Sequence, residues 1–269
     1  MNTKTKNSKT LQIVNIVSFV VVVVMNVLSN ALPLNGRTPG EISDSLPSFF
    51  TPAAYTFSIW SVIYLFLLGF TIYQALPSQR ERPFLGQIGW LFAGTTVLNV
   101  FWLLAWHYGF YAVSVLFMVG LLVTLITIYL RLNIGHRSAS LTIADKLLYQ
   151  TTFSLYLGWI TVATIANIAS VLGYLGWNGF GIDGQIWSAI MMMVAVVVAG
   201  LLLFNRRNLA YAGVLVWALF GIRAAYPTVP VIANTALVAA GLIVILALIG
   251  YWRTQKIEPA SPEPQVQTA

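Results

Sequence analysis

Long apolar segments occupy most of this chain and set the strongest limit on its fold. Eight of them approach or exceed the ~20 residues that a helix needs to cross about 30 Å of hydrocarbon. They lie at residues 13–32, 55–76, 88–106, 110–131, 147–172, 185–204, 209–225 and 229–252. Only 8% of the residues are charged, whereas soluble domains carry about 25%. The sequence therefore predicts an all-α polytopic membrane protein with eight transmembrane helices.

The basic residues are distributed as expected for such a topology. If the N-terminus is cytoplasmic, every Lys and Arg falls on the cytoplasmic side except Arg37 and Arg223, which is a strong positive-inside bias. The basic residues that give the net charge of +7 are scattered over short loops, so we expect no nucleic-acid partner. Both termini are predicted to be cytoplasmic, and the plasma membrane is the natural host if the source is bacterial.

The two ends of the chain need separate interpretation. Residues 1–12 are a basic cytoplasmic N-terminus, and the apolar run that follows looks like a signal peptide. This run is longer than the roughly 7–15 residues of a cleavable apolar region, so we expect it to be retained as a helix. Residues 253–269 are rich in proline and are predicted to form a disordered cytoplasmic tail.

The inventory of reactive groups favours binding over catalysis. The chain has no cysteine, which excludes thiol catalysis and disulfides. Its acidic residues all fall in predicted loops or the tail, so no proton relay is expected at mid-membrane depth. His107 and His136 are predicted on opposite sides of the membrane and cannot share a metal. We predict no enzyme activity, no catalytic or metal-binding residues and no required cofactor, with His107 as an axial haem ligand kept as an alternative.

Three segments carry aromatic and amide side chains at helical spacing. Steps of three and four residues place such side chains on one face of a helix. The candidate ligand-binding residues are Tyr55, Trp60 and Tyr64 in the second segment, Asn99, Trp102 and Trp106 in the third, and Tyr156, Trp159, Ala163 and Asn167 in the fifth. Thr51 and Pro52 are a helix start signal for the second segment.

An aromatic belt at the lipid headgroups is the simplest explanation for such residues. It suits Trp106 and Tyr55, but Trp159 lies about twelve residues from either end of its segment. Asn99 and Asn167 would need hydrogen-bond partners on other helices. Two interpretations stay open: these faces serve helix packing alone, or they also line a cavity for a flat hydrophobic ligand.

The same residues resemble motifs of the TspO/MBR family, the tryptophan-rich sensory or translocator proteins. The matches are YLGW at 156–159, Ala163, Thr164 and Asn167 on the fifth helix, LNVFW at 98–102 on the third, and Pro52, Trp60 and Tyr64 on the second. Leu155 replaces a family proline. The family's first pocket tryptophan falls on Ala54 or Tyr55, and Phe57 is out of register by one residue. The resemblance covers residues 13–172.

The resemblance implies a five-helix transmembrane bundle over residues 13–172, with residues 173–252 as a three-helix transmembrane extension. It implies porphyrin binding, cholesterol binding in animal members, and a homodimer. Trp60, Trp102 and Trp159 would form aromatic walls, the two amides would hold helices or polar ligand edges, and the loop 33–50 would act as a lid. Cholesterol-type motifs ending at Arg131 and Arg253 are too permissive to add weight.

These observations predict an integral membrane receptor or carrier for a flat hydrophobic ligand. The favoured ligand is a porphyrin or other tetrapyrrole, a haem-like molecule included, with a sterol as the alternative, and the role is sensory or transport. Two further interpretations stay open: an eight-helix small-solute transporter, and an accessory subunit whose last three helices dock a partner. The expected partners are the lipid bilayer, the hydrophobic ligand and a second copy of the chain.

Overall fold

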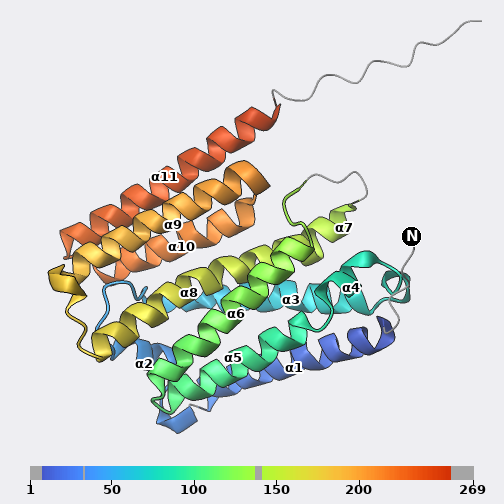
Figure 1. Cartoon of the computed structure of the whole chain (residues 1–269), viewed down its shortest axis with the longest axis horizontal. Coiled ribbons are helices and arrows are strands. Elements are labelled where there is room, and N and C mark those ends of the chain that lie inside the picture. The colour runs from blue at the N-terminus through green and yellow to red at the C-terminus, as the bar shows by residue number, and fades with distance from the viewer. Residues whose placement is uncertain (1–7, 33, 137–140, 256–269) are drawn as a thin grey trace, which may run out of the picture.

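Helices that run roughly along one common direction make up the structure (Figure 1). The computed structural model describes residues 8–32, 34–136 and 141–255, and no strand occurs among them. The elements are α1 (Ser8–Ala31), η1 (Leu34–Gly36), α2 (Pro39–Asp44), η2 (Ala54–Ser58), α3 (Ile59–Ala75), η3 (Pro77–Gln79), α4 (Pro83–Ile88), α5 (Leu91–His107), α6 (Tyr111–Arg131), α7 (Ile143–Asp145), η4 (Lys146–Thr151), α8 (Thr152–Tyr174), η5 (Gly179–Gly181), α9 (Gly184–Arg206), α10 (Leu209–Ala225) and α11 (Pro230–Gln255). The all-α prediction is confirmed.

Six helical stretches in the described part of the chain are long and apolar enough to cross a membrane. They are α1, η2 with α3, α6, α7 through α8, α9, and α11 as far as Trp252. The other two predicted crossings, α5 and α10, are apolar but have only 17 residues each. At 1.5 Å per residue such a helix is about 25 Å long, at the lower limit for a crossing. The chain is a multi-pass membrane protein, and the count of eight crossings stays a prediction.

Three of the predicted segments begin differently from the sequence expectation. The second begins as the 3₁₀ helix η2, and Thr51 is not its cap, because the Thr51 hydroxyl is buried without a hydrogen-bond partner among the described residues. The third is interrupted at Gly89, whose φ of 52° ends α4 before α5 starts. The fifth begins earlier, at a capping box made by Thr142 and Asp145, and passes through the π-helix η4.

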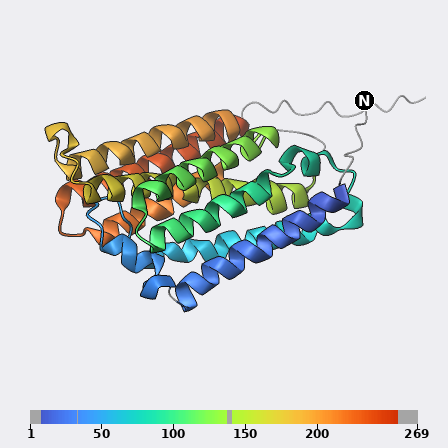
Figure 2. The ribbon, with the colours of Figure 1, turned by 60° about the horizontal axis from the view of Figure 1, so that its bottom comes forward.

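Helix α10 joins the last three helices to the rest of the molecule. Helix α1 packs on α3 and α5, and α6 packs on α5 and α8. Helices α9 and α10 both pack on α11, and α10 also packs on α8 (Figures 1 and 2). One cluster of buried hydrophobic side chains runs without a break from Leu11 of α1 to Ile243 of α11. The C-terminal helices therefore share the core of the preceding bundle.

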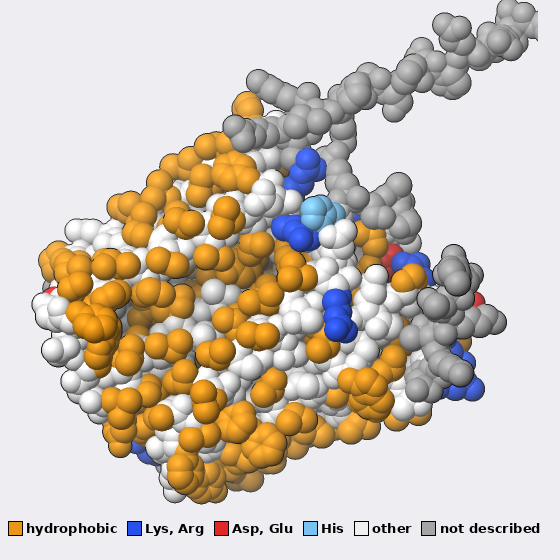
Figure 3. Space-filling view, in the orientation of Figure 1, with side chains coloured by type: hydrophobic (Ala, Val, Ile, Leu, Met, Phe, Trp, Pro, Cys, Tyr) orange, Lys and Arg blue, Asp and Glu red, His pale blue; other side chains and the backbone are white. Residues whose placement is uncertain are grey.

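The outer surface has the character of a membrane-embedded bundle. Large apolar side chains are exposed along the long helices, for example Val17 on α1, Leu116 on α6 and Val197 on α9. Hydrophobic side chains are spread over the whole face seen in Figure 3, and Lys and Arg gather toward the end where the N-terminus lies. An apolar surface with cations at one end is typical of a protein oriented by its basic loops.

Candidate functional site

A cavity of about 730 Å³ lies among α1, α2, η2, α3, α5 and α8. Helices α3 and α5 both pack on α1, and the cavity occupies the space between their facing sides. Small-molecule pockets span about 300–1,000 Å³, so this volume suits an organic ligand. The walls are mainly aromatic and aliphatic, and they contain no charged side chain among the described residues.

Eight of the ten candidate residues lie on the wall of this cavity. They are Trp60, Tyr64, Asn99, Trp102, Trp106, Trp159, Ala163 and Asn167. They come from three helices that are not consecutive in the chain, α3, α5 and α8. The helical spacing thus identified three faces, and the fold turns all three toward one space.

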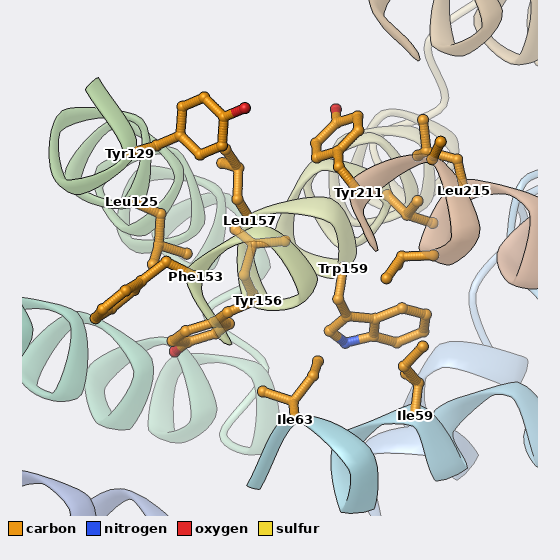
Figure 4. Close-up of a cluster of buried hydrophobic side chains, with 14 of the residues drawn as sticks. Ile59, Ile63, Leu125, Tyr129, Phe153, Tyr156, Leu157, Trp159, Tyr211 and Leu215 are labelled. Atoms are coloured by element: carbon orange, nitrogen blue, oxygen red, sulfur yellow. The ribbon is translucent and has the colours of Figure 1, made fainter. Parts of the chain in front are cut away.

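Trp159 stands at the centre of the aromatic wall. Its side chain is only 2% exposed, and it points toward Ile59 and Ile63 of the second segment (Figure 4). Its ring meets Phe57 edge-on, with centroids 5.7 Å apart, and Trp60 at 6.3 Å. Trp60 in turn stacks on Tyr64 at 5.3 Å. The tryptophan that an aromatic belt could not explain therefore faces the interior of the bundle.

Trp102 and Trp106 form a second aromatic surface, on α5. Their rings stack with centroids 6.1 Å apart and an interplanar angle of 20°. The indole nitrogen Nε1 of Trp106 donates to the Pro39 carbonyl of α2 at 3.3 Å. This bond attaches the short helix α2 to the cavity wall.

Both predicted amides hold pairs of helices together. Asn26 of α1 donates through Nδ2 to Oδ1 of Asn99 on α5 at 2.8 Å. Asn167 of α8 donates through Nδ2 to the Ser114 hydroxyl of α6 at 3.1 Å. Asn99, Asn167 and Asn26 also line the cavity. Helix packing and cavity lining are therefore two roles of the same side chains.

Three wall residues carry a buried polar atom that has no hydrogen-bond partner among the described residues. These atoms are the Tyr64 hydroxyl, Nδ2 of Asn99 and Nε1 of Trp102. A buried polar group left unpaired costs about 1–3 kcal/mol. All three can donate a hydrogen bond, so the chemistry of the wall suits a ligand with acceptor atoms.

Tyr55 and Tyr156 do not line the cavity. Residues 54–58 form a 3₁₀ helix, in which residues three apart lie on the same side, so Ala54 and Phe57 lie on the Trp60 side. Tyr55 is 49% exposed, meets Trp217 of α10 edge-on at 5.6 Å and borders a smaller cavity of about 350 Å³. Tyr156 is buried behind Trp60, 5.8 Å from its ring, and supports the wall from outside.

Several wall residues were not among the sequence candidates. They include Asn26 and Asn30 of α1, Pro39, Gly40 and Ser43 of α2, and Ala54, Phe57 and Ser58 of η2. Asn26 and Asn30 are four residues apart, a spacing that places both side chains on one face of α1 and could have identified them from the sequence. No local signal identified the η2 residues. If the segment is taken as an α-helix, Phe57 is one position out of register with the other residues of the motif.

The predicted lid segment contains the ordered helix α2 at the cavity wall. Thr38 and Glu41 form a capping box at its start, and these hydrogen bonds from Thr38 hold the pKa of Glu41 below its usual range. Ile42 of α2 is buried in one cluster with Trp106. Asn35 donates through Nδ2 to the His107 carbonyl at 2.9 Å.

His107 lies at the end of α5 and does not line the cavity. Its Nδ1 is 2.7 Å from the Leu103 carbonyl, and its side chain is buried. Within the described residues, no group of three or more His, Cys, Asp or Glu side chains is placed to hold a metal ion. His107 therefore lies outside the cavity wall, and its role as an axial haem ligand stays a prediction.

Comparison with known protein families gives a match over residues 12–249 to the family described as TSPO-like protein. The match extends beyond the motif region 13–172 and includes α9, α10 and nearly all of α11. No curated protein and no solved structure matches the chain. Because the matched region covers most of the sequence, including every helix that forms the cavity, the chain belongs to the TSPO-like protein family.

Proposed function

We propose that this membrane protein is a receptor or carrier whose ligand is a flat hydrophobic molecule of the tetrapyrrole type, held in the cavity between α3, α5 and α8. The position of Trp159 carries the proposal. Trp159 lies near the middle of the stretch from α7 through α8, too deep for an aromatic belt at the headgroups, and it is buried beside a space of ligand size. Aromatic rings pair with other π-systems by offset stacking or edge-on contact.

The polar atoms on the wall support a ligand that also carries hydrogen-bond acceptors. The Tyr64 hydroxyl, Asn99 Nδ2 and Trp102 Nε1 are buried without partners among the described residues. A tetrapyrrole has acceptor groups at the edge of a planar ring system, which complements both the donors and the aromatic faces. A sterol has a single hydroxyl and no π-system, so it complements the wall less well.

We also propose that all eight apolar helices cross the membrane. Helix α5 supplies Asn99, Trp102 and Trp106 to the cavity, so it has to lie at the same depth as α3 and α8. Its 17 residues suffice for a crossing near the lower length limit. With the bias of Lys and Arg described above, the termini would be cytoplasmic.

Titration with protoporphyrin IX tests the proposed site through quenching of tryptophan fluorescence. We expect Trp159→Ala and Trp102→Ala each to raise the Kd by about 30-fold or more, since central aromatic anchors are worth about 2 kcal/mol or more. Affinity is read from the concentration midpoint, because each variant also loses some signal. Trp252→Ala is the matched control, because Trp252 is 69% exposed on α11. An unchanged Kd in both cavity variants would reject this site.

A further inference from the structure

Helix α10 holds one wall of the ligand cavity in place, although it contributes no residue to the cavity itself. The wall in question is the segment 48–58, which connects α2 to α3. Pro52, Ala54, Phe57 and Ser58 of this segment line the cavity. The opposite side of the segment rests on α10 and on the turn that follows it (Figures 1 and 2).

Two hydrogen bonds join the backbone of the segment to α10. Nε1 of Trp217 donates to the Thr56 carbonyl at 2.9 Å. The Ala53 amide donates to the Gly221 carbonyl at 3.0 Å. These bonds are made by backbone groups that would otherwise have to be satisfied inside η2 or by water. They connect parts of the chain more than 160 positions apart.

A third attachment lies at the beginning of the segment. The Tyr226 hydroxyl, just after α10, donates to the Ser48 carbonyl at 2.6 Å. The Tyr226 ring also meets the ring of Phe49, with centroids 5.8 Å apart. The segment 48–58 is thus attached to the C-terminal helices near both of its ends.

Gly221 permits the close approach of η2 to α10. A Cβ at this position would lie 2.1 Å from the Thr56 hydroxyl oxygen and 2.7 Å from its methyl carbon. Any residue other than glycine at 221 would therefore displace η2 at Thr56. Gly213 is on the same helix, and a Cβ there would meet nothing within 4 Å. The need for glycine at 221 therefore comes from contact with the cavity wall.

We propose that α10 is a positioning element of the ligand site: Trp217, Gly221 and Tyr226 hold the segment 48–58 against the cavity and set how often this wall opens. This inference rests on the proposed function, because it makes opening of the segment the step that lets the cavity ligand leave. A segment with few internal hydrogen bonds opens locally with a free energy set by its external contacts. The C-terminal helices would then control ligand release without touching the ligand.

Hydrogen exchange measured by mass spectrometry on the full-length protein tests the attachment. Trp217→Phe removes the donor to Thr56 and keeps an aromatic ring, and Gly221→Ala forces η2 away from α10. We expect amides of the segment 48–58 to exchange about three- to tenfold faster in both variants, the effect of losing about one hydrogen bond. Amides of α6 should not change. Gly213→Ala and Trp252→Phe are the matched controls and should leave the segment unchanged.

The second measurement is the dissociation rate of protoporphyrin IX. It should rise by a similar factor in Trp217→Phe and Gly221→Ala, while the two controls match the parent. Thr56→Ala removes two of the three atoms closest to an added Cβ at 221, so it should restore slow release in the Gly221→Ala background. If Gly221→Ala caused a general structural defect, shortening the Thr56 side chain would not restore slow release.

The two proposals fail in different ways. If the parent protein binds no protoporphyrin, the proposed ligand is wrong, and the exchange data still decide whether α10 holds the segment. If protoporphyrin binds but exchange in 48–58 and its dissociation rate are the same in Trp217→Phe and Gly221→Ala as in the controls, the positioning role of α10 is overturned.

Discussion

Single polar side chains in the interior form hydrogen bonds that help to determine which helices of this protein pack together. An amide in an apolar environment needs a partner, and between membrane helices such a bond contributes about 0.6–2 kcal/mol. Asn99 finds its partner in Asn26, and Asn167 finds Ser114. The sequence indicated the need for a partner at both positions. It did not identify either partner, because the two members of each pair are more than 50 residues apart.

Asn26→Ala should lower the free energy of unfolding by about 0.6–2 kcal/mol, because it leaves Oδ1 of Asn99 without its donor. Unfolding by SDS in mixed micelles measures the change. Asn30→Ala is the matched control on the same helix, since the Asn30 amide donates only to the Asn26 carbonyl and the Ser29 hydroxyl of α1. Equal losses in the two variants would show that the contact between α1 and α5 adds nothing to stability.

Whole elements are positioned by contacts at their ends. The stretch from α7 through η4 to α8 begins at Ile143, and the Asp145 carboxylate accepts from Thr142 in the capping box at this end. The same carboxylate accepts from the Tyr73 hydroxyl at 2.8 Å and forms an ion pair with Arg82. Asp145 is fully buried, whereas the Arg82 side chain is 33% exposed. One carboxylate thus joins the start of this stretch to α3 and to the loop before α4.

Asp145→Asn should destabilise the protein by about 1–3 kcal/mol. The amide cannot replace the charge that pairs with Arg82, and hydrogen bonds to charged groups contribute about 1.5–3 kcal/mol, reduced here because solvent reaches Arg82. The melting temperature in detergent measures the change. Glu81→Gln removes an exposed carboxylate next to Arg82 and serves as the control. A melting temperature equal to that of Glu81→Gln would rule out this function of Asp145.

The distribution of charge and the lengths of the helices bear on how the bundle lies in the membrane. In the sequence, Lys and Arg lie mainly in every second loop between the apolar segments. In the structure, many of them lie at one end of the bundle (Figure 3). Within the described residues, six stretches are long enough to cross, and α10 is one of two shorter apolar helices. Because α10 packs along α8 and α11, it is expected to share their depth and to cross as well.

Single cysteines test this crossing without background, because the chain has no cysteine of its own. Asn205→Cys places a thiol in the last turn of α9, just before α10, and Thr228→Cys places one just after α10; both positions are exposed. We expect a membrane-impermeant maleimide to label Thr228→Cys from the outside of cells and Asn205→Cys only after the membrane is opened. Labelling of both from the same side would mean that α10 does not cross.

The class of the protein and the three helix faces that line the cavity could be predicted from the amino-acid pattern alone. Segment length and hydrophobicity are local properties, and so is the spacing that aligns Trp60 with Tyr64, Asn99 with Trp102, and Trp159 with Asn167 on one helix side. Such properties survive in any arrangement of the helices, so they can be read before the arrangement is known.

The rest of the cavity wall depends on how the helices pack and could not be predicted from the sequence. The tertiary structure turned Phe57 toward the cavity and Tyr55 toward Trp217, and it placed α10 behind η2 through Trp217 and Gly221. The physical reason is the range of the interactions. The short helix η2 is fixed by hydrogen bonds to residues more than 160 positions away, and no pattern within a single segment contains that information.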